Sequence, residues 1–143
     1  MLESERETRA VTTPKLNTGE SRELRLALDD RLKALLEIVR QELINSDNES
    51  YIELAGQVHD IEDESAADLL SDLNLAIITH HISEIREVEQ ALIRVRTGVA
   101  NMCEECGGEI GFERLQVHPT ALRCFRCQDI HEKTHASNHH STF

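Results

Sequence analysis

Aromatic residues are scarce in this chain of 143 residues: tryptophan is absent, and Phe, Tyr and Trp together make up 3%. Because aromatic side chains dominate large globular cores, we do not expect such a core. The sequence also lacks the apolar run of about eighteen residues that a membrane-spanning helix needs, so we expect no membrane partner. Leu, Ile, Ala and charged residues dominate instead, which is typical of long helices.

Clusters of lysine and arginine are also missing. The formal net charge is −12; residues 21–100 carry 17 acidic and 8 basic side chains, and residues 103–143 carry 6 and 4. Binding to nucleic acid depends on clustered cations that contact phosphates. We therefore expect no direct sequence-specific binding to nucleic acid, and we favour a basic surface or channel of a protein as the partner.

All four cysteines lie in one short segment, in the pattern Cys103-x2-Cys106-x17-Cys124-x2-Cys127. Two Cys-x-x-Cys pairs at this separation match the spacing of four-cysteine zinc sites. Four thiolates complete the tetrahedron around one Zn²⁺ and leave no open position for a substrate. The spacing therefore predicts one structural zinc ion.

Other uses of the cysteines are disfavoured. A disulfide framework belongs to secreted chains, and residues 1–5 do not begin a secretion signal, so we expect a cytoplasmic protein. A thioredoxin-type redox pair needs a βαβ context, which the sequence lacks. A zinc store or a redox sensor is a further alternative. With no open metal position, no phosphate-binding glycine loop and no nucleophile with an evident base, we predict that the protein is not an enzyme.

Two long stretches have apolar residues at helical spacing. The first begins near Ser21 and continues to about Gln57, interrupted by a polar run at residues 45–48. The second covers about residues 64–99 and opens with Ser65 and Asp68, a helix-start signal. The apolar positions of the first stretch include Leu28, Leu32, Leu35, Val39 and Leu43, and those of the second include Ile85, Val88, Leu92 and Val95.

Two amphipathic helices with a short polar connection most simply pack as an antiparallel hairpin. We predict a mainly α fold: a long antiparallel helical hairpin (a coiled coil) over residues 21–100, followed by a small zinc module over residues 101–133 that ends in a short helix. Arms of equal length require no more than a kink at residues 45–48, and they place the far end of the hairpin near residues 58–64. A parallel coiled-coil dimer is the alternative.

The ends of the chain have no helical period. Residues 1–20 are predicted to form a flexible arm, and residues 134–143 a His-rich tail that is either a disordered end or a weak metal binder. His80 and His81 lie within the second helical stretch, where they serve either in packing or in metal binding.

Four acidic residues occupy five positions at residues 60–64, which we name the acidic segment. These residues form either a solvated turn before a helix or a narrow acidic tip presented to a basic or metal-containing site of a partner.

The segment from Cys103 to Cys127 resembles the zinc region of the DksA/TraR family of bacterial RNA polymerase regulators. The similar elements are Glu109-Ile110-Gly111, Arg114-Leu115 and Pro119-Thr120-Ala121, and the resemblance extends over roughly residues 24–133. It implies a transcription regulator that binds RNA polymerase and inserts the tip of its coiled coil into the secondary channel, near the active centre, without binding DNA.

The tip motif of that family is Asp-x-x-Asp-x-Ala, which implies that Asp60 and Asp63 act on the polymerase, with Ser65 at the position of the alanine. Some members respond to the alarmone guanosine tetraphosphate through basic residues near the coil base and on the zinc module. A gap-free alignment from the cysteines places Glu87, His118 and Gln128 at those positions. None offers a fixed positive charge for a phosphate, so the resemblance implies a weak alarmone response or none.

The alternative function is that of a zinc-stapled helical adaptor that binds another protein or a ribonucleoprotein. Replacing Asp60 and Asp63 by asparagine distinguishes the two functions, because only the polymerase regulator depends on these acids.

Overall fold

The computed structural model of this chain describes residues 15–58, 65–72 and 78–138. Apart from one isolated β-bridge between Met102 and Glu109, the regular structure of these residues is helical. The helices are α1 (Thr18–Ile44), α2 (Glu49–Ala55), α3 (Ala66–Asp72), α4 (Thr79–Arg96), α5 (Phe112–Val117) and α6 (Phe125–Asn138). No described helix combines the length and the apolar character that crossing a membrane would require.

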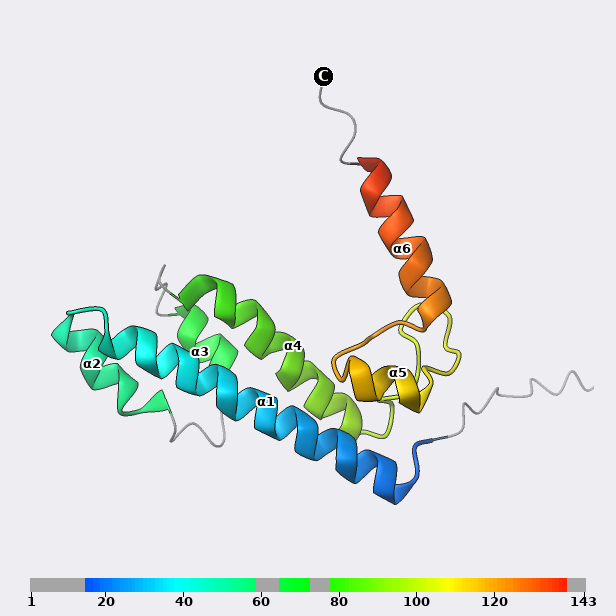
Figure 1. Ribbon diagram of the computed structural model, residues 1–143, viewed down its shortest axis with the longest axis horizontal. Coiled ribbons are helices and arrows are strands. Elements are labelled where there is room, and N and C mark those ends of the chain that lie inside the picture. The colour runs from blue at the N-terminus through cyan, green and yellow to red at the C-terminus, as the bar shows by residue number, and fades with distance from the viewer. Residues whose placement is uncertain (1–14, 59–64, 73–77, 139–143) are drawn as a thin grey trace, which may run out of the picture.

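Helices α1 and α4 form the central pair of helices in the structure. They lie side by side and run in opposite directions (Figure 1), and each packs against the other more extensively than against any other helix. Their facing stripes are buried, as the periodicity predicted: Leu28, Leu35, Val39 and Leu43 on α1 and Ile85 and Val88 on α4. The predicted fold class, a mainly α antiparallel hairpin with a small C-terminal module, is confirmed.

Helix α1 begins earlier than predicted because Asn17 caps it. The Asn17 side chain accepts a hydrogen bond from the Glu20 backbone N–H at 2.8 Å, and the Glu20 carboxylate accepts one from the Asn17 N–H at 3.1 Å. This reciprocal capping box satisfies two backbone donors that a helix N-terminus otherwise leaves without partners. The helix therefore starts at Thr18, inside the segment predicted to be a flexible arm.

The polar run at residues 45–48 reverses the chain, so the expectation of one helix with at most a kink as far as Gln57 is wrong. Asp47 has φ 59°, in the left-handed region that aspartate tolerates better than most residues. The Asn48 side chain then accepts hydrogen bonds from the backbone N–H groups of Ser50 and Tyr51 and caps α2. Helix α2 runs back along α1 and packs against it (Figure 1).

The second predicted helix is also divided. Helix α3 ends at Asp72, and α4 begins at Thr79 and packs against α3. Ala66, Ala67 and Leu70 of α3 are buried in the same hydrophobic core as the stripes of α1 and α4. Folding α3 back covers apolar surface that one extended helix would leave in water, which is the physical reason for the break.

The fold-back fixes the position of Ser65, the first described residue after the acidic segment. Ser65 directly follows this segment, and its hydroxyl lies 3.0 Å from the carboxylate of Glu89, in the second half of α4. Ser65 therefore lies alongside the hairpin, next to α4. The described chain reverses at a different place, at residues 45–48, at the far end of α1. Residues 59–64, which include Asp60 and Asp63, lie outside the described residues.

A short joint connects α4 to the zinc module. Gly98, with φ 78°, ends the helix: the N–H groups of Gly98 and Val99 donate to the carbonyl oxygens of Val95 and Arg94. Arg94 also donates to the carbonyl of Met102. Helix α5 packs against the start of α1, while α6 projects away from the hairpin (Figure 1) and continues to Asn138, into the segment predicted as a tail.

Candidate metal centre

The four cysteines converge at one point of the C-terminal module. Cys103 and Cys106 flank a tight turn, and Cys124 and Cys127 lie at the start of α6. Their four sulfur atoms lie within 4.8 Å of one another, and the Sγ atoms of Cys106 and Cys124 are 3.9 Å apart. Thiolates around a tetrahedral Zn²⁺, with Zn–S bonds of about 2.3 Å, are about 3.8 Å apart. The geometry therefore fits one zinc ion with four sulfur ligands.

Backbone hydrogen bonds shape the first cysteine pair. Gly107 has φ 69°, a conformation that a residue without a Cβ adopts at little cost. Its N–H donates to the Cys103 carbonyl at 3.0 Å, and the Gly108 N–H points at the Cys106 sulfur at 3.3 Å. A Cβ at Gly108 would lie 3.2 Å from that sulfur. The two glycines thus let the chain turn closely around the thiolates.

Two contacts join the halves of the module. The Glu104 N–H donates to the Leu122 carbonyl at 2.8 Å, and the Arg123 side chain donates to the Glu105 carboxylate at 2.9 Å. The hydrogen bond from Arg123 lowers the pKa of Glu105 below its ordinary value. Protein contacts therefore hold the two cysteine pairs together, although 17 residues separate them in sequence. A zinc ion shared by the four sulfur atoms would add to these contacts.

The pKa values and close spacing of the four cysteine thiols favour a bound cation. Burial raises the pKa of Cys103, but hydrogen bonds from the backbone of Cys106, Cys124 and Glu105 outweigh it and lower this pKa to about 6. The pKa of Cys127 is raised to about 12, first by its hydrogen bond with Cys124 and then by burial. Four thiolates at this spacing repel one another, and a divalent ion that binds deprotonated sulfur relieves the repulsion. The cluster thus fits a structural zinc, as predicted.

Of the predicted polymerase-acting residues, only Ser65 is described, and it caps a helix. Its hydroxyl accepts a hydrogen bond from the Asp68 N–H at 3.2 Å, which confirms the predicted helix start. The Glu89 carboxylate accepts hydrogen bonds from the Ser65 hydroxyl and from the N–H groups of Ala66 and Ala67, at 3.0–3.1 Å. Sequence reasoning missed Glu89, because nothing local links it to a helix start 24 residues earlier.

Three positions that the resemblance aligns with alarmone-contacting residues come together in space. Glu87, His118 and Gln128 line a groove of about 630 Å³ between α4 and the module. Three arginines line the same groove, and each already has a partner. Arg86 pairs with Asp68 at 2.8 Å, Arg123 pairs with Glu105, and the Arg114 side chain donates to the Arg123 carbonyl; these contacts lie at 2.8–3.1 Å.

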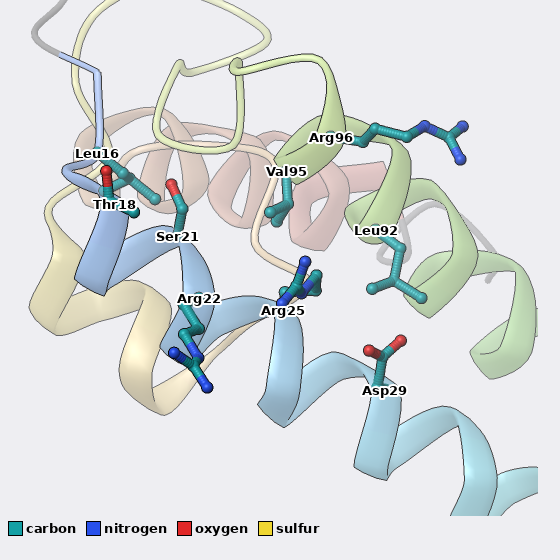
Figure 2. Close-up of a pocket in the computed structure, with 9 residues that line it drawn as sticks. All are labelled: Leu16, Thr18, Ser21, Arg22, Arg25, Asp29, Leu92, Val95 and Arg96. Carbon is teal, nitrogen blue, oxygen red and sulfur yellow. The ribbon is translucent and has the colours of Figure 1, made fainter.

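A second groove, of about 710 Å³, lies between the start of α1 and the end of α4. Leu16, Leu92 and Val95 provide apolar walls, and Figure 2 shows Arg22, Arg25 and Arg96 pointing in different directions around it. The three guanidinium groups therefore do not converge on one point of the groove.

A further group of possible metal ligands lies far from the cysteines. Glu42, near the end of α1, and His80 and His81, in the first turn of α4, have ligand atoms within 4.8 Å of one another. The His81 Nε2 atom lies 2.9 Å from the Glu42 carboxylate, and the two imidazole rings are 3.8 Å apart. His81 thus contacts the partner helix, as the packing alternative expected, and His80 joins the same cluster.

Comparison with known proteins supports the identification of the module. The sequence profile of the prokaryotic dksA/traR C4-type zinc finger matches residues 96–133. The RNA polymerase-binding transcription factor DksA of Caulobacter vibrioides is 30% identical over 97 residues, which cover 66% of this chain and 68% of that protein. The protein of the same name in Escherichia coli K12 is 40% identical over 48 residues, which cover 34% of this chain and 32% of that protein.

The fold has a solved counterpart as well. The structure of transcription factor DksA2 from Pseudomonas aeruginosa matches with a TM-score of 0.56 at 20% sequence identity, covering 84% of this chain and 88% of that one. At this identity, the match shows a shared fold. The Caulobacter alignment is too long to be confined to the zinc module, so it also includes helical sequence. On these grounds the chain belongs to the DksA/TraR family of proteins with a C4-type zinc finger.

Proposed function

We propose that this protein is a non-enzymatic transcription regulator that binds RNA polymerase in the cytoplasm. The observation that carries the proposal is the relative from Caulobacter vibrioides, named an RNA polymerase-binding transcription factor, whose similarity covers two thirds of both chains. The closed four-cysteine site is consistent with this function, because it stabilises a module and leaves no metal position open for catalysis.

The acidic segment is the part that acts on the polymerase in this proposal. Asp60 and Asp63 enter the secondary channel and alter the charge near the active centre, while the zinc module orients the hairpin. The net charge of −12 favours a basic channel over nucleic acid. The Ser65–Glu89 contact anchors the chain to α4 two residues after Asp63.

The proposal predicts that Asp60→Asn combined with Asp63→Asn abolishes the effect on transcription and leaves polymerase affinity within about twofold of the wild type. The substitution removes two charges while the contacts of α1, α4 and the module are unchanged. Affinity is measured by pull-down or fluorescence titration, and the effect by transcription in vitro from a stable-RNA promoter. Glu53→Gln combined with Asp72→Asn is the matched control, since it removes two exposed acids of α2 and α3.

Two results would contradict the proposal in distinguishable ways. A double Asp60/Asp63 variant that regulates as the wild type does would exclude the acidic segment and leave polymerase binding intact. Failure of the wild-type protein to bind polymerase would exclude the whole function and favour the zinc-stapled adaptor. Photo-crosslinking from Ile61 locates the acidic segment on the polymerase directly, and crosslinks outside the secondary channel would exclude insertion.

We also predict a weak response to guanosine tetraphosphate, or none. The groove at the aligned positions presents Glu87, His118 and Gln128, and its arginines are already paired. Glu87→Lys combined with Gln128→Lys supplies the missing cations, and we expect it to raise the alarmone response severalfold. Promoter repression measured with and without the alarmone checks this prediction. Strong enhancement of the wild-type protein would refute it.

A further inference from the structure

The end of the hairpin remote from the zinc module holds three metal-ligating side chains from two helices. Glu42 comes from the last turn of α1, and His80 and His81 come from the first turn of α4. One nitrogen or oxygen of each lies within 4.8 Å of the others, and His81 Nε2 is 2.9 Å from a Glu42 oxygen. The His81 side chain is 14% exposed and that of Glu42 29% exposed, whereas His80 is exposed, so the cluster lies at the edge of the core with one side open to water.

The helical geometry makes this convergence unusual. Neighbouring residues of an α-helix point about 100° apart around the axis. Nevertheless the rings of His80 and His81 approach to 3.8 Å between centroids, at 45° between their planes. Both rings therefore lean toward the same carboxylate on the opposite helix.

A salt bridge between His81 and Glu42 does not satisfy the cluster. The Nδ1 atom of His81 and the second carboxylate oxygen of Glu42 are buried and have no hydrogen-bond partner among the described residues. A buried polar atom without a partner costs about 1–3 kcal/mol. A cation that binds the Glu42 carboxylate supplies a partner for its second oxygen.

We propose that Glu42, His80 and His81 form a second metal site, which binds Zn²⁺ through one carboxylate and two imidazoles. Two histidines and one carboxylate are a donor set that zinc accepts, with a fourth position left for water. At zinc–ligand distances of about 2.0–2.2 Å, ligand atoms in a tetrahedron are about 3.4 Å apart. The observed 2.9 Å separation of His81 and Glu42 needs to open by only about half an ångström.

The ion would fasten α4 to α1 at the end where the chain reverses, opposite the four-cysteine site. The two sites differ in chemistry: one offers four thiolates, and the other offers nitrogen and oxygen. Zn²⁺ accepts both donor sets, so the same ion can occupy both ends. The proposal does not depend on polymerase binding.

Zinc stoichiometry tests the site. The full chain is equilibrated with excess zinc, dialysed against micromolar free zinc and analysed by plasma mass spectrometry. We expect two ions per wild-type chain and one in Glu42→Gln and in His81→Asn, with affinity for the second ion at least about tenfold lower, since even the loss of a supporting contact costs a zinc site that much. The matched control replaces the C-terminal His131, His135, His139 and His140 by asparagine and keeps two ions.

Cobalt provides a second measurement that identifies the ligands. Co²⁺ at the four cysteines gives sulfur-to-metal charge-transfer absorption, whereas a second equivalent at Glu42, His80 and His81 adds only the weaker d–d bands of a nitrogen and oxygen site. Glu42→Gln preserves the size of the side chain, so it decides the test if far-ultraviolet circular dichroism shows that His81→Asn disturbs the helices. One zinc per wild-type chain, or a second ion lost only in the C-terminal histidine variant, would overturn the proposal.

Discussion

At the scale of single residues, Glu89 shows how one carboxylate can serve as the cap of a helix to which it does not belong. It accepts hydrogen bonds from a hydroxyl and from two backbone N–H groups at the start of α3. These donors lie in the turn where a helix cannot satisfy its own backbone, and a negative charge there also suits the helix dipole. Ser65, compared with the alanine of the family motif, adds a donor for this carboxylate.

We predict that Glu89→Ala destabilises the protein by about 1–3 kcal/mol, because it leaves three donors without an acceptor. Glu89→Gln keeps one oxygen and should lose about half as much. Urea unfolding gives the free energies, and hydrogen exchange shows whether the amides of Ala66 and Ala67 lose protection. The control, Glu87→Ala, removes an exposed acid of the same helix and should change stability by less than about 0.5 kcal/mol. Equal effects of Glu87→Ala and Glu89→Ala would show that the cap contributes nothing.

At the scale of helices, the periodicity of apolar residues predicted well which helix faces are buried, but it predicted poorly where the helices begin and end. The predicted apolar stripe of α1 is buried as expected, at Leu28, Leu35, Val39 and Leu43. This stripe could be predicted because an apolar repeat of three or four residues is a local signal that does not depend on how the rest of the chain folds. The polar run at residues 45–48 is a local signal for a break in the helix, but it does not distinguish a kink from a reversal, since Asn and Asp favour both left-handed turns and helix caps. The fold-back of α3 had none, because it depends on burying Ala67 and Leu70 against helices distant in sequence.

The candidate sites divide in the same way. The cysteine cluster could be predicted because its ligands are coded by spacing within 25 residues. The pairs Glu42–His81 and Ser65–Glu89 are separated by 39 and 24 residues, so their proximity appears only once the helices are packed.

The reversal at Asp47 can be tested with two substitutions that have opposite effects in a turn and in a helix. In the left-handed conformation, Asp47→Gly should be neutral or stabilising by up to about 1 kcal/mol, while Asp47→Ala should destabilise by about 1 kcal/mol. In a continuous helix the order is reversed, because alanine is the best helix former and glycine among the worst. Chemical denaturation of both variants decides, and a more stable alanine variant would contradict the reversal.

At the scale of the whole molecule, the hairpin and the zinc module have different sources of stability. The hairpin buries a continuous core of leucine, isoleucine and valine, whereas the module has few buried apolar side chains, Ile110 and Leu115 among them. Structural zinc contributes about 10–16 kcal/mol to small folds of the module's kind. The module should therefore depend on its ion, and the hairpin should not.

We predict that a strong chelator unfolds the module and leaves α1 and α4 paired. Hydrogen exchange should show lost protection at Ile110 and Leu115 and retained protection at Val39 and Ile85. Cys103→Ser should reproduce the chelated state without chelator, and Glu104→Gln, at the exposed neighbouring residue, should resemble the wild type. Retained protection of Ile110 and Leu115 after complete zinc removal would show that the module folds by packing alone.

The joint between α4 and the module has a mechanical consequence. It consists of the Gly98 turn and the hydrogen bond from the Arg94 side chain to the Met102 carbonyl. On the module side, the backbone N–H of Ile110 donates a hydrogen bond to the carbonyl of the buried Asn101. Helix α1, with 27 residues, is about 40 Å long, so a rotation of about 5° at this joint moves the opposite end by about 3.5 Å. A substitution beside Gly98 can therefore displace atoms at the end of the hairpin opposite the zinc module, although it does not contact them.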